Sequence, residues 1–187
     1  GTASPDTRLE LNFYTGRVEV DGKYVTLDDG TPLQYMPLAV EQNLTASKYI
    51  ETAGARMKKY EVDRTAYSDG RMPDNDIVLY RYADVLLMKA EAKVRNGESG
   101  DEQLNAVRSR AGMPSLAATL ANILDERLLE LVWEGWRRQD MIRFGTYCAP
   151  YDIHTPSAAD KKRYTIVFPI PEKARELNPN LAQNPGY

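Results

Sequence analysis

The chain has 187 residues, 42% of them hydrophobic, and its 24 basic and 27 acidic residues leave a formal net charge of −3. This length allows one domain with a substantial core, but no apolar run approaches the roughly 18 to 20 residues of a membrane-spanning helix. Basic residues are interspersed with acidic ones, which argues against nucleic acid or an anionic membrane as the main partner. Having only one cysteine, Cys148, and one histidine, His154, the chain excludes an internal disulfide and the usual Cys/His zinc site.

A β-hairpin is predicted in the first part of the chain. Asp21 and Gly22 lie between two short apolar segments and tolerate the positive φ angles of a tight turn, and Asp29 with Gly30 supplies a second turn. Asp21, Asp28 and Asp29 could suggest a calcium site, but the alternation and the glutamate of an EF-hand loop are missing. The preferred interpretation of these aspartates is turn formation.

The segment that follows is irregular, because residues such as Pro37, Gly54 and Pro73 interrupt any periodicity. We therefore expect residues 1–75 to form a loop-rich segment with a β-hairpin. Residues 76–187 are expected to form a helical region within the same structural unit.

Two helices are predicted next, and together they form an antiparallel hairpin. The first covers residues 76–96, and a second apolar stripe at Leu104, Val107 and Ala111 is terminated by Gly112, as helices usually end at a glycine. The hairpin resembles one tetratricopeptide unit, although the fixed period of that repeat does not recur in the chain. The apolar stripe of the first helix comprises Leu79, Tyr82, Ala83, Leu86, Ala90 and Val94.

A long amphipathic helix is predicted over residues 123–145 and serves as the scaffold of the fold. Trp133 and Trp136 lie three residues apart, so two neighbouring faces can be buried, and Gly145 ends the helix. Gly135 suggests a bend, since glycine in a helix costs about 1 kcal/mol relative to alanine. Its apolar positions recur at helical intervals: Leu120, Leu124, Leu128, Leu131 and Ile142.

Charged side chains on this helix are spaced for pairing. Glu134 precedes Arg137 and Arg138 by three and four residues, and Asp140 precedes Arg143 by three. Each exposed pair of this kind contributes only about 0.2–0.5 kcal/mol to helix stability.

The C-terminal part contains a short apolar run at residues 164–168, closed by Pro169 and Pro171, which predicts an edge strand or an extended packing segment. The tail after it contains repeated Asn-Pro and Pro-Asn steps. These steps predict extended or turning structure rather than helix, both for residues 169–173 and for residues 177–187.

Four blocks resemble one protein family in the same order. RYADVLLMKAEA at residues 81–92, LNAVRSRAGMP at residues 104–114, and the charged segment at residues 126–145 match three internal blocks, and FPIP with NPNLAQNPGY at residues 168–187 matches the ending. The sequence is similar in these blocks to the SusD/RagB outer-membrane nutrient-binding lipoproteins of Bacteroidota. The resemblance covers roughly 110 residues, from Asp76 onward.

The resemblance implies a mainly α, SusD-like fold: a tetratricopeptide-like hairpin plus a long scaffold helix, a small β-hairpin region and an extended C-terminal tail. It also implies capture of a glycan or oligosaccharide at the cell surface and its transfer to a TonB-dependent, SusC-like outer-membrane transporter. In such a protein no bond is made or broken and no cofactor is needed.

Family members are longer than this chain, and they carry an amino-terminal lipoprotein signal, an anchoring cysteine and first helical repeats. The chain begins instead with a polar run at residues 1–8, so we expect a carboxy-terminal portion whose membrane anchor lies outside it. Removal of upstream helices should leave an exposed apolar patch. Ligand-recognition residues vary within the family, so no binding residue is transferred and the ligand-binding residues stay unknown.

Aromatic side chains are the first candidates for sugar stacking. Trp133 and Trp136 offer suitable rings, but their place in an amphipathic helix favours a core role. The loop tyrosines are better placed, although each one taken singly has packing as its simplest role. This pool comprises Tyr35, Tyr49, Tyr60, Tyr67, Tyr147 and Tyr151.

Two alternative functions stay open. Glu126, Glu130 and Glu134 share one helix face at four-residue spacing, which is compatible with a glycoside hydrolase. Nearby arginines would favour ionised acids, however, and nothing converges on a nucleophile and base. His154 is expected to be exposed and inert, and Cys148 to be a small packing residue. The other alternative is a helical-repeat adaptor that binds proteins through its helical hairpin.

Overall fold

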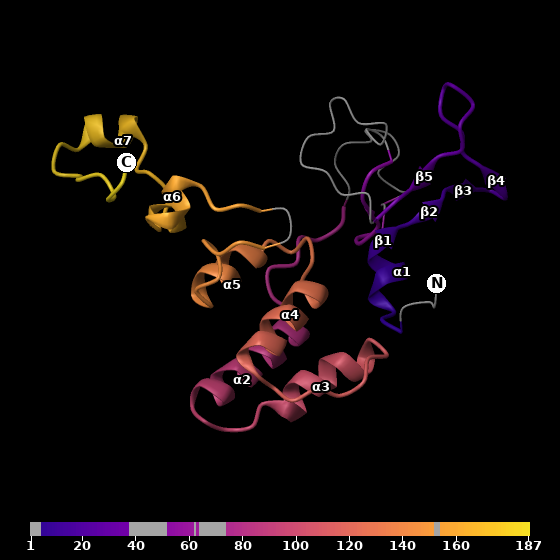
Figure 1. The fold of residues 1–187 in the computed structure, drawn as a ribbon, viewed down its shortest axis with the longest axis horizontal. Helices are drawn as coiled ribbons and strands as arrows, with labels where there is room; N and C mark the ends of the chain where they lie inside the picture. The colour runs from indigo at the N-terminus through magenta and orange to yellow at the C-terminus, as the bar shows by residue number, and fades with distance from the viewer. Residues whose placement is uncertain (1–4, 38–51, 62, 64–73, 152–153) are drawn as a thin grey trace. The chain divides into compact units, whose positions relative to one another are not determined.

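The computed structural model describes residues 5–37, 52–61, 63, 74–151 and 154–187 (Figure 1). The chain divides into two compact units, Gly1–Gly135 and Trp136–Tyr187. The sequence-based division at residue 75 stays a prediction. Among the helices of the described ranges, none is both long and apolar enough to cross a membrane.

The first unit begins with helix α1 (Arg8–Asn12), followed by short strands that pair in antiparallel fashion. The predicted hairpin is confirmed, because Asp21 (φ 51°) and Gly22 (φ 75°) form the turn between the paired strands β3 (Glu19–Val20) and β4 (Lys23–Tyr24). Thr31 donates its backbone N–H to Asp29 Oδ1 at 2.8 Å, which supports the turn interpretation of that aspartate. The pairs are β1 (Phe13–Tyr14) with β6 (Arg56–Met57), β2 (Gly16–Arg17) with β5 (Gln34–Tyr35), and β3 (Glu19–Val20) with β4 (Lys23–Tyr24).

The predicted helical hairpin is also confirmed, although its first helix begins at Tyr82 and residues 76–81, which were included in the prediction, are not helical. Helices α2 (Tyr82–Arg95) and α3 (Asp101–Arg110) pack together, and α4 (Leu120–Glu130) packs against both (Figure 1). The approach is close at Gly100, where an added Cβ would lie 2.6 Å from the backbone oxygen of Ala90. The described part of the chain is therefore mainly helical with few short strands, as expected.

The buried face of α2 differs from the predicted apolar stripe. Leu79 and Tyr82 are 71% and 76% exposed, whereas Asp84, which is not part of the predicted apolar stripe, is 1% exposed. The reason is a buried ion pair, since Arg127 Nη1 on α4 lies 2.7 Å from Asp84 Oδ1. Pairing satisfies the charges that a purely apolar pattern would keep out of the core. The buried residues of α2 are Asp84, Leu87, Ala90 and Glu91.

The prediction of one continuous helix over residues 123–145 is wrong. Helix α4 ends at Glu130, and α5 (Arg137–Arg143) begins only after an irregular turn. In that turn Trp133 and Gly135 have φ angles of 61° and 81°, and left-handed backbone cannot continue a right-handed helix. Gly135 therefore marks a break, where the sequence suggested a bend.

The first unit also exposes several large apolar side chains within residues 77–88, and the expected apolar patch stays a prediction. Ile77 is 87% exposed and Val85 is 47% exposed. The exposed members are Ile77, Leu79, Tyr80, Tyr82, Val85 and Met88.

The second unit contains α5, α6 (Ala158–Lys161), the 3₁₀ helix η1 (Tyr164–Ile166) and α7 (Glu172–Leu177). The predicted pair between Asp140 and Arg143 is confirmed at 2.7 Å. The strand interpretation of residues 164–168 is wrong, because η1 occupies their first part. The tail is helical in α7, contrary to prediction, and non-helical after Leu177, as predicted.

Side chains hold the non-helical tail to the segment after η1. Gln183 accepts a hydrogen bond from the Ile170 N–H at 2.8 Å and donates one to the Ile170 carbonyl at 3.0 Å. Tyr187 donates its hydroxyl to the Val167 carbonyl at 2.9 Å. The tail is thus an ordered part of the second unit.

Candidate functional site

Three glutamates project from α4 and the turn after it, and the structure places each of them against cations. The side chains of Glu126, Glu130 and Glu134 are only 1 to 2% exposed. Glu126 pairs with Arg8 and Arg108, both at 2.7 Å. Glu130 pairs with Arg8 (3.0 Å), with Arg110 (2.5 Å) and with Arg81. Glu134 pairs with Arg81 (2.8 Å) and with Lys59.

These pairs determine the ionisation of the carboxylates. Burial raises the pKa of Glu130, but hydrogen bonds and charges from Arg81, Arg110 and Arg8 outweigh it and leave the pKa below its ordinary value. Burial likewise raises the pKa of Glu134, and Arg81 with Lys59 reverses the effect. A general acid needs a raised pKa. Glu130 and Glu134 therefore have the environment of structural anions.

The loop tyrosines lie in different surroundings. Tyr35 on β5 is half-buried beneath the Arg56 guanidinium, 5.1 Å from its ring centroid, and Tyr147 is half-buried beneath Arg138 at the same distance. Tyr151 is exposed and stacks on His154 at 4.7 Å. Tyr60 is 39% exposed. Two further candidates, Tyr49 and Tyr67, lie outside the described residues.

The remaining reactive residues lie in the second unit. Cys148 is half-buried with its Sγ 3.8 Å from Thr165 Oγ1, in keeping with a packing role. His154 is half-buried against Tyr151, so the prediction of an exposed side chain is wrong. In the described ranges, no group of three or more His, Cys, Asp or Glu is arranged to hold a metal ion.

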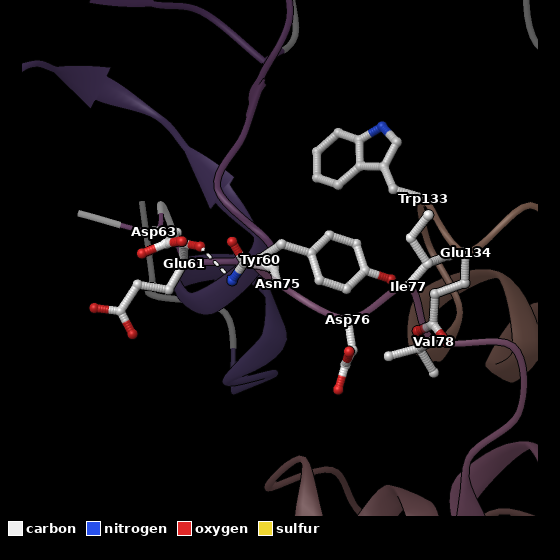
Figure 2. A pocket seen from close by; sticks show the side chains of 9 residues that line it. All are labelled: Tyr60, Glu61, Asp63, Asn75, Asp76, Ile77, Val78, Trp133 and Glu134. Atoms are coloured by element: carbon white, nitrogen blue, oxygen red, sulfur yellow. Dashed lines mark hydrogen bonds between the residues drawn. The ribbon is translucent and has the colours of Figure 1, made fainter. Parts of the chain in front are cut away.

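One hollow in the first unit combines exposed aromatic rings with polar groups, and it is the candidate site. Its volume is about 460 Å³, within the usual range for small-molecule sites. Figure 2 shows Tyr60 extended toward Ile77 and Glu134 with the Trp133 indole nearby, while Glu61 and Asp63 lie at the opposite end. The lining residues are Tyr60, Glu61, Asp63, Asn75, Asp76, Ile77, Val78, Trp133 and Glu134.

The exposure of Trp133 contradicts the predicted core role. Its side chain is 40% exposed because the chain leaves α4 at Glu130 and turns through a left-handed residue at position 133. The Phe13 ring supports the indole, with ring centroids 4.7 Å apart and planes inclined by 48°. Trp136, in contrast, is half-buried at the start of the second unit.

The backbone of Tyr60 is also in the left-handed conformation, with φ at 69°, and this conformation is rare for a residue with a bulky side chain. Its neighbour Lys59 holds it in place by pairing with Glu134 and by donating to the Glu130 carbonyl at 3.2 Å. The backbone N–H of Lys59 also donates to the Asn12 carbonyl at 3.2 Å. Burial, and next the charge of Glu134, raise the pKa of Tyr60, so its phenol stays a neutral hydrogen-bonding group at physiological pH.

Polar groups from two segments complete the lining. Asn75 Nδ2 donates to the Glu61 carbonyl at 3.1 Å (Figure 2), and the Asp74 N–H donates to Asp63 Oδ2 at 2.8 Å. These bonds join the segment after Tyr60 to the segment before Ile77. Sequence reasoning missed Glu61, Asn75 and Asp76 as site residues, and the only available signal was an acidic, loop-rich composition.

Comparison with known proteins gives the same family at the level of sequence and fold. The model of the SusD family matches residues 33–155. The starch-binding protein SusD of Bacteroides thetaiotaomicron is 31% identical over 139 residues, which cover 71% of this chain and 25% of that protein. The SusD-like protein P25 of Formosa agariphila is 36% identical over 134 residues, covering 61% and 25%. The chain therefore spans about a quarter of the length of these curated relatives.

Solved structures show the same fold. The surface glycan-binding protein A of Bacteroides uniformis superposes with a TM-score of 0.62 at 24% identity, over 98% of this chain and 38% of that one. A SusD superfamily protein from Bacteroides fragilis gives 0.63 at 21% identity, over 100% and 38%. Given the family match over most of its length, the chain belongs to the SusD family.

Proposed function

We propose that this chain is part of a cell-surface protein that captures a glycan or oligosaccharide and passes it to a TonB-dependent outer-membrane transporter. The observation that carries the capture step is the hollow in which Tyr60 and Trp133 present exposed rings beside carboxylates and an amide. Two relatives named for starch binding and surface glycan binding support it. Transfer to the transporter and lipid anchoring outside this chain rest on the family resemblance.

The hollow suits the chemistry of sugars. A pyranose has apolar C–H faces, which pack on the faces of aromatic rings, and hydroxyl edges, which bond to carboxylates and amides. Trp133 and Tyr60 supply the faces, while Asn75 and Asp76 supply polar groups at the same hollow. Rings held by a constrained backbone lose little freedom on binding, so less of the interaction energy is spent on ordering them.

The state of the buried carboxylates supports capture without catalysis. The buried glutamates Glu130 and Glu134 are committed to cations and have lowered pKa values, so neither suits the role of general acid. The pure protein, incubated with a glycan that it binds, should therefore release no reducing sugar.

Affinity electrophoresis tests the proposal. The wild-type chain is run through native gels that contain amylopectin, laminarin, galactomannan or xyloglucan, together with Trp133→Ala. We expect at least one polysaccharide to retard the wild type and Trp133→Ala to lose that retardation, because the variant removes the larger platform.

The matched control is Tyr24→Ala, which removes another exposed aromatic of the same unit, 58% exposed and outside the hollow. This variant should migrate like the wild type. If no polysaccharide retards the wild type, or if both variants lose retardation equally, capture at this hollow is contradicted.

The adaptor alternative makes a different prediction. Affinity purification with this chain should then return a soluble protein in place of an outer-membrane transporter.

A further inference from the structure

We propose that the hollow selects neutral or amino sugars and discriminates against anionic ones such as uronates and sulfated sugars. This inference rests on the proposed function and adds the charge class of the ligand.

The charged residues in the described part of the lining all have one sign. Four carboxylates line the hollow, from Glu61, Asp63, Asp76 and Glu134, and its described lining contains no lysine or arginine. Glu61 and Asp76 are exposed, and among the described residues neither carboxylate forms an ion pair. Both therefore keep their charge available to a ligand.

The cations nearest the hollow are paired with Glu134, and the ammonium of one of them, Lys59, lies 5.9 Å from the centroid of the Tyr60 ring. Lys59 and Arg81 pair with Glu134, and they line a separate hollow of about 400 Å³ together with Arg8 and Arg110. Glu134 is thus largely neutralised, whereas neither Glu61 nor Asp76 forms an ion pair with a described cation, although Lys58 and Lys59 line an adjacent hollow together with Glu61. Among the described residues that line the Tyr60–Trp133 hollow, the charges without an ion-pair partner, those of Glu61 and Asp76, are therefore negative.

The chemistry of carboxylates defines the ligand that fits. An ionised carboxylate only accepts hydrogen bonds, so its partners must be donors such as hydroxyl or ammonium groups. A uronate or sulfate group brings a second anion within a few ångströms, where salt screens little because the Debye length is about 8 Å at physiological ionic strength. Repulsion of the wrong ligand is a common route to specificity.

The test uses one polymer in two charge states. The neutral polysaccharide retained by the wild-type chain is compared with the same polymer after oxidation of its primary hydroxyls to carboxylates, in affinity gels at low and high NaCl. We expect the wild type to bind the oxidised polymer roughly three- to tenfold more weakly, a difference that shrinks at high salt.

The double variant Glu61→Gln/Asp76→Asn should bind the oxidised polymer more tightly than the wild type does and so reduce the difference. The control Glu19→Gln/Glu98→Gln removes two exposed charges outside the hollow and should leave the difference unchanged. Equal or tighter wild-type binding of the oxidised polymer overturns the charge selectivity while capture stands, and so does an unchanged difference in the Glu61/Asp76 variant. Failure of every neutral and oxidised polymer to bind overturns the proposed function itself.

Discussion

The first compact unit contains two groups of carboxylates in opposite environments. Glu126 and Glu130 have side chains about 1% exposed, and each contacts at least two arginines. Glu61 and Asp76 are exposed at the rim of the hollow. Burial and partners thus separate a structural carboxylate from one that can contact a ligand. The four-residue spacing of Glu126, Glu130 and Glu134 in the sequence does not show which of these two environments a carboxylate has.

The largest expected effect is on the buried group. Glu126→Gln removes the carboxylate paired with the buried Arg108 and one of the three paired with Arg8, which should lower the free energy of unfolding by about 3–5 kcal/mol. Urea denaturation followed by circular dichroism measures it. Glu61→Gln makes the same chemical change at the rim and should stay within about 0.5 kcal/mol of the wild type. Similar losses in both variants would abolish the distinction.

Glycan affinity should depend on the hollow and not on the buried carboxylates. Trp133→Ala should weaken glycan binding at least about tenfold, because large aromatic anchors contribute most to such sites. Glu126→Gln should bind like the wild type under conditions where it stays folded. Isothermal titration calorimetry at low temperature gives both values, and loss of affinity in Glu126→Gln alone would place recognition at the buried group.

Acid should destabilise the protein through its buried carboxylates. The pKa values of Glu130 and Glu134 are lowered in the folded state, so their contribution to stability is complete above their ordinary value of 4.5 and is lost as pH falls below it. The urea midpoint should therefore decline between about pH 5 and pH 3. Glu134→Gln should flatten this decline relative to Glu61→Gln, and equal slopes would show that other groups dominate acid unfolding.

The smallest effect concerns the backbone at Trp133. With φ at 61°, this position strains alanine but not glycine, so Trp133→Gly should be more stable than Trp133→Ala by about 1 kcal/mol. At Leu128, inside α4, the order should invert, because glycine is the poorer helix residue. Thermal unfolding of the four variants checks both signs. The same order at both positions would mean that Trp133 is not left-handed in solution.

The sequence predicts the regular parts of this fold well. Helical periodicity and terminal glycines indicate the hairpin of α2 and α3, and Asp21 with Gly22 indicates the β-turn, because both signals depend on local backbone preferences. The orientation of α2 is mispredicted, since the buried pair between Asp84 and Arg127 involves residues 43 positions apart, and no local pattern reports such a contact.

The candidate site was predicted only in part. Tyr60 belongs to the predicted pool of loop tyrosines, but the spacing of Trp133 fits a continuous helix and therefore predicts a core position. The helix instead ends at Glu130, and the exposed position of the indole follows from that ending. Glu61 and Asp76 come together with Trp133 only through tertiary packing, which lies beyond the reach of periodicity.

The turn at Trp133 has a consequence for how relatives diverge. The direction of the indole depends on the number of residues between the last turn of α4 and Gly135, so one inserted residue would rotate the ring away from the hollow whatever its identity. Natural selection for this surface should therefore act on the length of the turn. A relative that keeps the four-residue interval from Glu130 to Glu134 is a better candidate for shared ligand recognition than one that merely aligns a tryptophan.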